Sequence, residues 1–287
     1  MEQKSEPTPP VVLPGEPEAT PSSGSCAEPH HAHDDLSSRE FRIFAASRRG
    51  RSHELAGKPR EDVFALAVGD PHWWFAAVAD GAGSRSRSRL GAEVATNAAV
   101  SYVRGASNVI NDPTIVLNGA ARSSVEALQA RALQSEYDIA DLACTLLLLL
   151  WTSTTEGGCV TTFQAGDGLI ASISEDGTLV ALNDADEESF AGSTHFITGT
   201  HVQNTWEQRV RTSSPQNDTR AFLLMSDGVA DDLIPYQRNG PILARELSRI
   251  AKDEQPATAL LNDVLAYHKR GSFDDRTMVV GWRQIGV

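Results

Sequence analysis

The chain lacks an excess of positive charge. Its 287 residues include 25 Lys and Arg against 38 Asp and Glu, which gives a formal net charge of -13. Sequence-independent binding to nucleic acid or to an anionic membrane surface requires a surplus of basic residues over a surface. We therefore expect neither nucleic acid nor a membrane among its partners, although a local basic patch is compatible with this overall charge.

No hydrophobic run is long enough to cross a membrane. Residues 142–151 (LACTLLLLLW) form an apolar run, but a membrane-spanning helix needs about 20 apolar residues. We expect a buried strand there instead. The start of the chain, MEQKSEPTPP, also lacks the basic residues followed by an apolar stretch that an export signal requires. We therefore expect no signal peptide and a cytoplasmic location.

Cysteine is scarce and irregularly spaced. The chain has 3 cysteines, Cys26, Cys144 and Cys159. Their spacing matches no metal-binding motif, and any disulfide would leave one of them unpaired, which favours a reducing compartment. Because Cys144 and Cys159 fall inside apolar, strand-like segments, where a thiolate is disfavoured, we do not expect a cysteine nucleophile.

Large apolar side chains are nearly absent from residues 1–38, which are rich in Pro, Glu, Ser and Thr. Ordering such a segment costs conformational entropy that burial does not offset, so we predict a disordered tail followed by one domain over residues 39–287. The histidines between residues 30 and 33 could hold a metal together with Cys26. A short polar histidine cluster is more often solvated, and we interpret it that way.

After residue 40, short apolar runs alternate with helical patterns. The runs that predict strands are 41–47, 63–69, 73–79, 142–151, 159–166, 169–174, 178–183, 221–226 and 277–282. Helices are predicted from about Leu90, from Pro113, from Pro241, and from Pro256 to Gly271. Blocks of strands separated by paired helices predict an α+β fold, with a central antiparallel β-sandwich flanked by pairs of helices in four layers, α-β-β-α.

Two Asp-Gly pairs directly follow apolar runs. VADGAG contains Asp80-Gly81, and MSDGVADDL contains Asp227-Gly228. A third pair, in SISEDGTLVAL, lies between two strand-like stretches, where a two-residue hairpin is expected. The first two are followed by helical or irregular sequence instead. A carboxylate at the end of a buried strand is costly to desolvate without a cation, and the glycine allows the sharp turn that brings the backbone close to a ligand.

Further acids lie at predicted strand ends: Asp62, Asp167, Asp274 and Asp275. If these ends converge, each pair of like charges at 4 Å would repel by about 4 kcal/mol at an effective dielectric near 20. Such a cluster requires cations, and ligands that are all oxygen select Mg²⁺ or Mn²⁺. Two such ions can activate a bridging water and hold a phosphoryl group, which suits the slow hydrolysis of phosphate monoesters.

Five motifs in this order resemble the metal-dependent protein serine/threonine phosphatases of the 2C type, over about residues 45–285. They are GRSHELAGKPREDVF (50–64), VADGAGSRSRSRLGAEVA (78–95), AGDG (165–168), LLMSDGVADDL (223–233) and GSFDDRTMVV (271–280). The likeness is greatest to the bacterial branch, in which a Ser-His…Gly-x-Pro…Asp segment opens the domain.

The resemblance implies a set of metal ligands. Asp80 would bridge two ions, Mn²⁺ or Mg²⁺, the Gly81 carbonyl would bind one of them, and Asp227 with Asp274 would complete the other. Asp167 would lie near a third ion, where one binds. In the catalytic set, Asp62 would hold a metal-bound water. Asp275 stands where the family usually has Asn and is expected to be a neighbour of the ligands.

Two departures from the family pattern concern catalysis. The common Asp-Gly-His-Gly has Ala82 in place of its histidine, which is often proposed as the acid for the leaving oxygen. The position of the usual phosphate-binding arginine, five residues before the first Asp, is Gly57. His53 is the candidate for either role, because imidazole titrates near neutrality. Its alternative is an ordinary, partly exposed histidine after a turn. The cations near the motifs that could bind phosphate are Lys58, Arg60, Arg85 and Arg87, although a solvated loop is the favoured interpretation of the SRSRSR run (84–89).

The leading hypothesis is hydrolysis of phosphoserine and phosphothreonine in proteins by attack of a bridging metal-bound water, in a monomer whose partner is its phosphoprotein substrate. Two alternatives remain open. The chain could be a catalytically impaired relative that acts as a phosphoprotein-binding scaffold, which the missing histidine and arginine favour. It could also hydrolyse small phosphoesters with the same metals.

Overall fold

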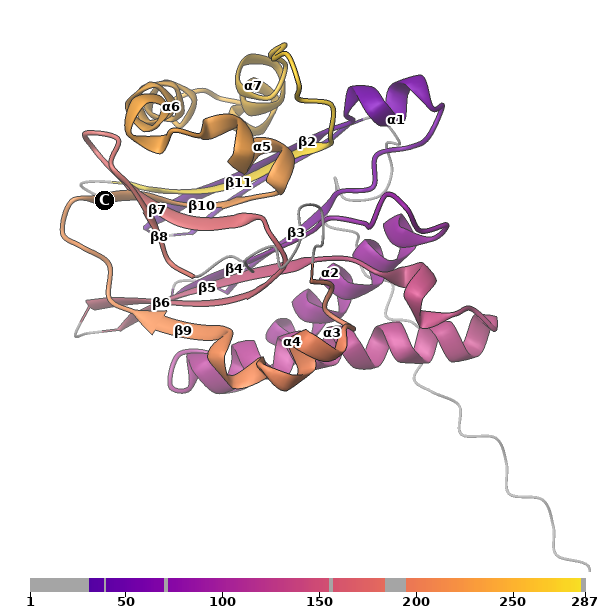
Figure 1. The fold of residues 1–287 in the computed structure, drawn as a ribbon. Coiled ribbons are helices and arrows are strands. Elements are labelled where there is room, and N and C mark those ends of the chain that lie inside the picture. Colours follow the sequence, from indigo (N-terminus) through magenta and orange to yellow (C-terminus); the bar gives the residue numbers. More distant parts are fainter. Residues whose placement is uncertain (1–30, 39, 70–71, 155–156, 184–194, 285–287) are drawn as a thin grey trace, which may run out of the picture.

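Two β-sheets lie face to face between two layers of helices (Figure 1). The computed structural model describes residues 31–38, 40–69, 72–154, 157–183 and 195–284. Within them every pairing between neighbouring strands is antiparallel. The predicted α+β sandwich in four layers is confirmed.

The strands divide between a six-stranded and a five-stranded sheet in the described residues. In spatial order, the first sheet contains β1 (His31–Ser37), β2 (Phe41–Arg48), β11 (Arg276–Arg283), β10 (Thr219–Met225), β7 (Leu169–Ser174) and β8 (Leu179–Ala181). The second sheet contains β3 (Val63–Gly69), β4 (Trp73–Ala79), β5 (Leu146–Thr154), β6 (Gly157–Ala165) and β9 (Val210–Ser213).

The long helices cover the outer faces of the two sheets (Figure 1). The α-helices are α1 (Arg51–Leu55), α2 (Ser88–Gly105), α3 (Pro113–Ser135), α4 (Thr200–Asn204), α5 (Asp227–Ala230), α6 (Tyr236–Ile250) and α7 (Pro256–Ala259). Shorter turns are η1 (Ile139–Leu142), η2 (Trp206–Gln208), η3 (Asp231–Leu233) and the π-helical η4 (Leu260–Val264). The described part of the chain contains no helix long and apolar enough to cross a membrane.

Alternation along the strands divides the core into three layers. On β3, Val63 and Ala65 face α2 and α3, whereas Phe64 and Leu66 face the other sheet. The layer between the sheets is aromatic: Phe41, Trp74, Trp151 and Phe222 contact one another with ring centroids 4.9–6.4 Å apart. Because aromatic rings bury large areas, this layer fixes how the two sheets face each other.

Part of the segment that was predicted to be disordered forms a strand. We expected disorder up to residue 38, but His31–Ser37 forms β1 and pairs along its whole length with β2. The pairing depends on backbone hydrogen bonds, and Ala32 is its fully buried side chain, so composition gave little signal. His31 and His33 are exposed. Residues 1–30, with Cys26 and His30, lie outside the described residues.

Two helix boundaries differ from the prediction. Pro241 lies inside α6, which begins at Tyr236. At this position in α6, Pro241 removes a single backbone hydrogen bond. The hairpin residue Gly177 packs directly on Pro241. The last predicted helix does not continue to Gly271: it passes through η4 and ends near Leu265, because the segment beyond it turns toward Asp232.

Replacing Gly91 by alanine is expected to destabilise the protein. A Cβ at this position of α2 would lie 2.1 Å from the carbonyl oxygen of Leu142, and backbone cannot move aside cheaply. We expect a loss of about 2 kcal/mol in the free energy of unfolding, measured by urea denaturation. Gly105→Ala in the same helix is the control, because nothing lies within 4 Å of its Cβ position and alanine is the better helix former. Equal effects of the two substitutions would contradict this packing.

Candidate functional site

The aspartates singled out from the sequence meet at one end of the sandwich, where α1 and α5 lie (Figure 1). Asp62 precedes β3 and Asp80 follows β4, and their neighbours Val63 and Ala79 are paired across the two strands. Asp227 follows β10 and Asp274 precedes β11, which are also adjacent. The sheet topology therefore collects carboxylates from residues far apart in the sequence. We call Asp62, Asp80, Asp167, Asp227 and Asp274 the acid cluster.

Asp62 is held by groups from the other sheet. Its Oδ2 accepts hydrogen bonds from the Ser226 hydroxyl at 2.8 Å and the Thr277 hydroxyl at 2.6 Å. Thr277 in turn contacts the Ser47 hydroxyl at 2.5 Å. The residue is almost fully buried, and its carboxyl group lies within hydrogen-bonding reach of Asp80. A carboxylate that β3 supplies is thus fixed by β10 and β11.

The pKa values of the cluster show how strongly the carboxylates oppose one another's ionisation. Burial raises the pKa of Asp62 to about 7, and the charge of Asp275 adds to the effect, against the bonds from Thr277 and Ser226. Burial, followed by the charges of Asp62 and Asp227, raises the pKa of Asp80 well above its ordinary value. Burial and the charge of Asp274 raise the pKa of Asp227 to about 8. Without cations the cluster retains protons at neutral pH.

Asp274 and Asp167 border the cluster nearer to solvent. The Asp274 carboxylate accepts from the Asp275 amide at 2.8 Å, and the pKa of Asp274 is raised by partial desolvation, against that bond. The charge of Asp167, in the turn between β6 and β7, contributes to raising the pKa of both Asp227 and Asp274. The structure therefore brings together all five predicted aspartates.

The two glycines that follow the cluster acids are tightly enclosed. A Cβ on Gly81 would lie 2.8 Å from the backbone carbon of Ser88, at the start of α2, and Gly81 forms an isolated bridge with Cys144. A Cβ on Gly228 would lie 2.1 Å from the carbonyl oxygen of Asp275. Close backbone approach explains both glycines. Gly177, in the third Asp-Gly pair, turns with a φ of +88° between β7 and β8, as predicted for a hairpin.

His53 is buried beside the cluster and is paired with Asp275. Its Nδ1 lies 3.0 Å from the Asp275 carboxylate, and its Nε2 lies 3.8 Å from Glu61. The close pairing of its ring with the Asp275 carboxylate raises the pKa of His53, against burial. A Cβ on Gly83 would lie 3.9 Å from Nε2. His53 therefore borders the loop in which Ala82 replaces the histidine expected from the resemblance.

Asp275 makes more contacts with the segment before β3 than the sequence indicated. It accepts hydrogen bonds from the Gly50 amide at 2.6 Å, the Glu61 amide at 2.5 Å and the Asp62 amide at 3.3 Å. Burial opposes its ionisation, but the bonds from His53 and these amides lower its pKa overall. Asp275 is thus a charged anchor for the segment before β3.

Three further residues were not singled out from the sequence: Glu61, Ser226 and Thr277. Glu61 is buried, accepts from the Ser88 hydroxyl at 3.0 Å and lies 3.7 Å from the Lys58 ammonium. The available signal was polar residues placed directly at the ends of apolar strands, but many such residues only cap strands.

The four cations near the motifs have different surroundings. Arg60 is fully buried and donates to the Ser47 hydroxyl and the Asp62 carbonyl, so the expectation that it is available for phosphate is wrong. Lys58 donates to the Gly83 carbonyl at 3.1 Å and lies beside the cluster. Arg87 stacks over Tyr137 at 4.0 Å. Arg85 is exposed.

The described residues contain no group of three or more His, Cys, Asp or Glu side chains arranged to hold a metal ion as they stand. One oxygen of Asp227 accepts from the Gly228 amide at 2.6 Å, as Asp274 does from its own neighbour, so both carboxylates face the backbone in part. The chemistry of the acid cluster still fits a hard cation, because its five side chains all offer carboxylate oxygens.

A cysteine nucleophile is opposed by the structure. Cys144 is fully buried in the apolar core, and burial raises the pKa of its thiol to about 12. A thiol with so high a pKa carries almost no thiolate at neutral pH.

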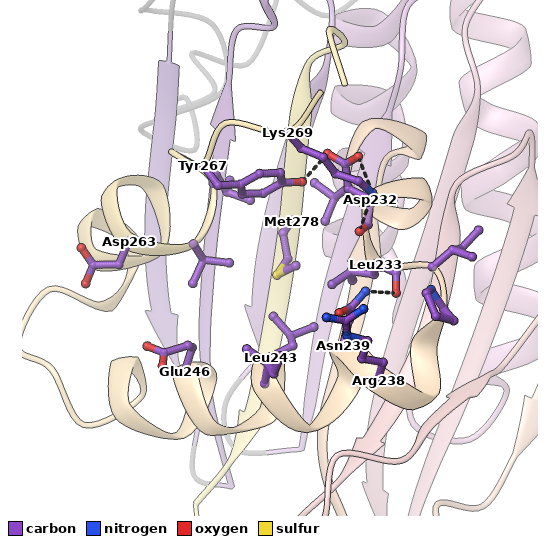
Figure 2. A pocket seen from close by; sticks show the side chains of 16 residues that line it. Asp232, Leu233, Arg238, Asn239, Leu243, Glu246, Asp263, Tyr267, Lys269 and Met278 are labelled. Carbon is purple, nitrogen blue, oxygen red and sulfur yellow. Dashed lines mark hydrogen bonds and ion pairs between the residues drawn. The ribbon is translucent and has the colours of Figure 1, made fainter. Parts of the chain in front are cut away.

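A separate pocket of about 550 Å³ lies between α6, η3 and η4 (Figure 2). Its lining is mainly apolar, with Leu243 and Met278 among its residues, and it contains none of the acid-cluster aspartates. On its polar wall, Asp232 accepts from the Tyr267 hydroxyl at 2.6 Å and pairs with the Lys269 ammonium at 3.1 Å. Asp232, although part of the MSDGVADDL motif, therefore joins the loop after η4 to α5.

Comparison with known proteins agrees with this geometry. The sequence model described as protein phosphatase 2C matches residues 49–266. Serine/threonine-protein phosphatase 3 of Escherichia coli is 31% identical over 170 residues, which cover 55% of this chain and 63% of that relative, less than two thirds of its length.

Two solved structures share the fold. A serine-threonine phosphatase 2C from Toxoplasma gondii has a TM-score of 0.63 at 14% identity, covering 89% of this chain and 100% of the other. The catalytic domain of the serine/threonine phosphatase PstP, in complex with 2 manganese ions, has a TM-score of 0.57 at 18% identity, covering 85% and 98%. At these identities the likeness concerns the fold, whereas the family match spans more than half of the chain. The chain belongs to the protein phosphatase 2C family.

Proposed function

We propose that this chain hydrolyses phosphoserine and phosphothreonine in proteins, with Mn²⁺ or Mg²⁺ held by the acid cluster. The observation that carries the proposal is the convergence of Asp62, Asp80, Asp227 and Asp274, whose pKa values are raised by burial and by neighbouring carboxylates. Family membership supports the same activity.

Asp80, the Gly81 carbonyl, Asp227 and Asp274 are the proposed ligands of two ions, and Asp167 borders a third position. PstP, which shares the fold, is solved with 2 manganese ions. When bound, such ions supply charge that stabilises the phosphoryl group and lowers the pKa of water. To serve as ligands, Asp227 and Asp274 would have to turn the oxygen that now accepts from a backbone amide.

Asp62 is the proposed proton acceptor. Its Oδ2 is occupied by Ser226 and Thr277, so the carboxyl group cannot rotate freely and its other oxygen is held toward the cluster. In its ionised form, the Asp62 carboxylate would accept the proton of the attacking water. The hydrogen bonds from the two hydroxyls to Oδ2 keep the carboxyl group in a single orientation.

His53 is the proposed donor of the proton to the leaving oxygen. Asp275 fixes its Nδ1 and raises its pKa, so the ring stays protonated at higher pH than a free histidine. Nε2 is the nitrogen left to donate, and it lies beside Gly83, on the side of the loop where Ala82 leaves the usual histidine absent.

The substitution His53→Gln is expected to lower kcat for a phosphothreonine peptide by roughly 10²-fold, the lower end for loss of a general acid. The loss for p-nitrophenyl phosphate should be much smaller, because p-nitrophenolate leaves without protonation. Steady-state kinetics with both substrates test this. His72→Gln, at an exposed histidine, is the control. Equal losses for both substrates would contradict an acid role and indicate a positional one.

Purified full-length protein with Mn²⁺ tests the function itself. We expect turnover of a phosphothreonine peptide that disappears with EDTA, and much slower hydrolysis of ATP and of sugar phosphates. If no substrate is hydrolysed, but the phosphopeptide binds, the scaffold alternative holds. If the small phosphoesters are the better substrates, the protein is a small-molecule phosphatase.

A further inference from the structure

A second cavity, of about 320 Å³, lies between α1 and the segment that precedes β11, and its lining is rich in basic side chains. We call it the basic pocket. Its basic side chains are Arg48, Arg49, Arg51, His268, Lys269, Arg270 and Arg276, and Glu54 is its acidic residue. This concentration of positive charge runs against a chain whose net charge is -13.

Two of these cations already pair with a carboxylate. Lys269 lies 3.1 Å and Arg276 lies 3.7 Å from the Asp232 carboxylate, and Figure 2 shows Lys269 turned toward Asp232. Arg276 also donates to the Tyr267 carbonyl at 2.8 Å. These two side chains are part of the structural network and are not available to a ligand.

Three other arginines have no such partner. Arg48, Arg51 and Arg270 are exposed, and no hydrogen bond or ion pair with another described residue engages their side chains. Arg49 donates only one bond, to the Lys58 carbonyl at 3.2 Å. Like charges gathered around one cavity repel each other, and nothing in the fold of this region requires them. An anion from outside would satisfy them.

The basic pocket and the acid cluster share a wall. Gly50 lines the pocket, while its amide donates to the Asp275 carboxylate and its Cα packs on the Asp274 backbone. Phe273, also in the lining, accepts from the Ser52 amide at 2.9 Å through its carbonyl. A peptide whose phosphorylated residue reaches Asp274 would therefore carry its neighbouring residues past the pocket.

We propose that the basic pocket binds an anionic side chain, a carboxylate or a further phosphate, that flanks the phosphoserine or phosphothreonine of a protein substrate. The proposal rests on the proposed function and narrows it to substrates with acidic surroundings. Arginine suits this role because its planar guanidinium forms paired hydrogen bonds with carboxylate and phosphate oxygens.

The same anionic chemistry is present in this chain. Residues 1–30 contain Glu2, Glu6, Glu16, Glu18 and Glu28 against Lys4. The segment joins β1 at His31, which pairs with Arg48, beside the pocket. We favour the substrate as the source because the pocket borders the cluster directly. If the segment occupied the pocket, removing the arginines would speed the hydrolysis of acidic peptides.

The test compares two full-length triple variants with the wild type. One is Arg48→Ala/Arg51→Ala/Arg270→Ala. The control, Arg238→Ala/Arg245→Ala/Lys252→Ala, removes the same number of exposed positive charges on and after α6, so the net charge of the two variants is equal. KM and kcat are measured for two phosphothreonine peptides, flanked by Glu or by Gln, and for p-nitrophenyl phosphate.

We expect the pocket variant to raise KM for the Glu-flanked peptide by about 10-fold, from three exposed charge contacts, with kcat unchanged. KM for the Gln-flanked peptide and for p-nitrophenyl phosphate should stay the same, as should all values for the control. Equal effects on both peptides, the same effect in the control, or faster turnover would overturn the proposal. Failure of the proposed function is distinct, since the wild type would then hydrolyse neither peptide.

Discussion

Replacing Asp80 by alanine is expected to lower kcat/KM for p-nitrophenyl phosphate in Mn²⁺ by roughly 10³-fold or more, because several kcal/mol of transition-state stabilisation would be lost with a proposed metal ligand. The same substitution should make the metal-free protein more stable at pH 8. Burial and neighbouring charges raise the pKa of Asp80, so its ionisation opposes folding. Activity and stability therefore move in opposite directions.

The control for Asp80→Ala is Asp176→Ala, in the Asp-Gly pair of the β7–β8 hairpin. Asp176 is exposed and its pKa is lowered by the Ser174 hydroxyl, so it takes no part in the cluster. We expect its activity to equal that of the wild type. Activity is measured with and without EDTA, and stability by thermal unfolding in EDTA. Mn²⁺-dependent turnover by the Asp80→Ala protein would contradict the metal-site proposal.

The metal-free protein should lose stability as the pH rises from 5 to 8. The ordinary pKa of an aspartate is 3.8, and those of Asp62 and Asp227 in the folded protein are about 7 and about 8. A raised pKa means that the folded protein favours the protonated form of the carboxyl group. The stability that this preference contributes is complete below pH 3.8, and it is lost as the pH rises through the pKa values of the folded protein. The raised pKa of His53 acts in the same direction.

The expected size of this effect is several kcal/mol, since each pKa unit corresponds to about 1.4 kcal/mol and the two carboxyl groups are not independent. In EDTA the melting temperature should fall by roughly 10 °C between pH 5 and pH 8. Saturating Mn²⁺ should remove most of the fall, because bound cations stabilise the ionised cluster. An EDTA melting temperature that stays constant or rises over this range would contradict the electrostatic account. Asp227→Asn provides the internal check, with a smaller fall.

Much of the fold could be predicted because its strands carry strong apolar patterns. The runs at 63–69, 73–79 and 169–174 coincide with β3, β4 and β7, and the family resemblance holds. β1 and β9 were missed. Both are edge strands with polar, exposed side chains, and their pairing depends on a neighbouring backbone that local sequence does not specify.

The position of the cluster acids could be predicted in part for the same reason. An Asp-Gly pair after a buried strand identified Asp80 and Asp227, and the hairpin sequence excluded Asp176. The support of the cluster could not be predicted. Asp275 acts through amides of the segment before β3, more than 200 residues away in sequence, and Ser226 meets Asp62 only when the two sheets face each other. Such contacts are properties of the tertiary structure.

Asp62 precedes a strand of one sheet and is hydrogen-bonded to residues of the other, so its position depends on how the two sheets pack together. Neither sheet can slide over the other without withdrawing the hydroxyls of Ser226 and Thr277 from this carboxyl group. A small shift in the aromatic layer formed by Phe41, Trp74 and Phe222 would therefore displace the proposed proton acceptor without unfolding the protein. We expect a protein with a loosened core to lose turnover before it loses its fold.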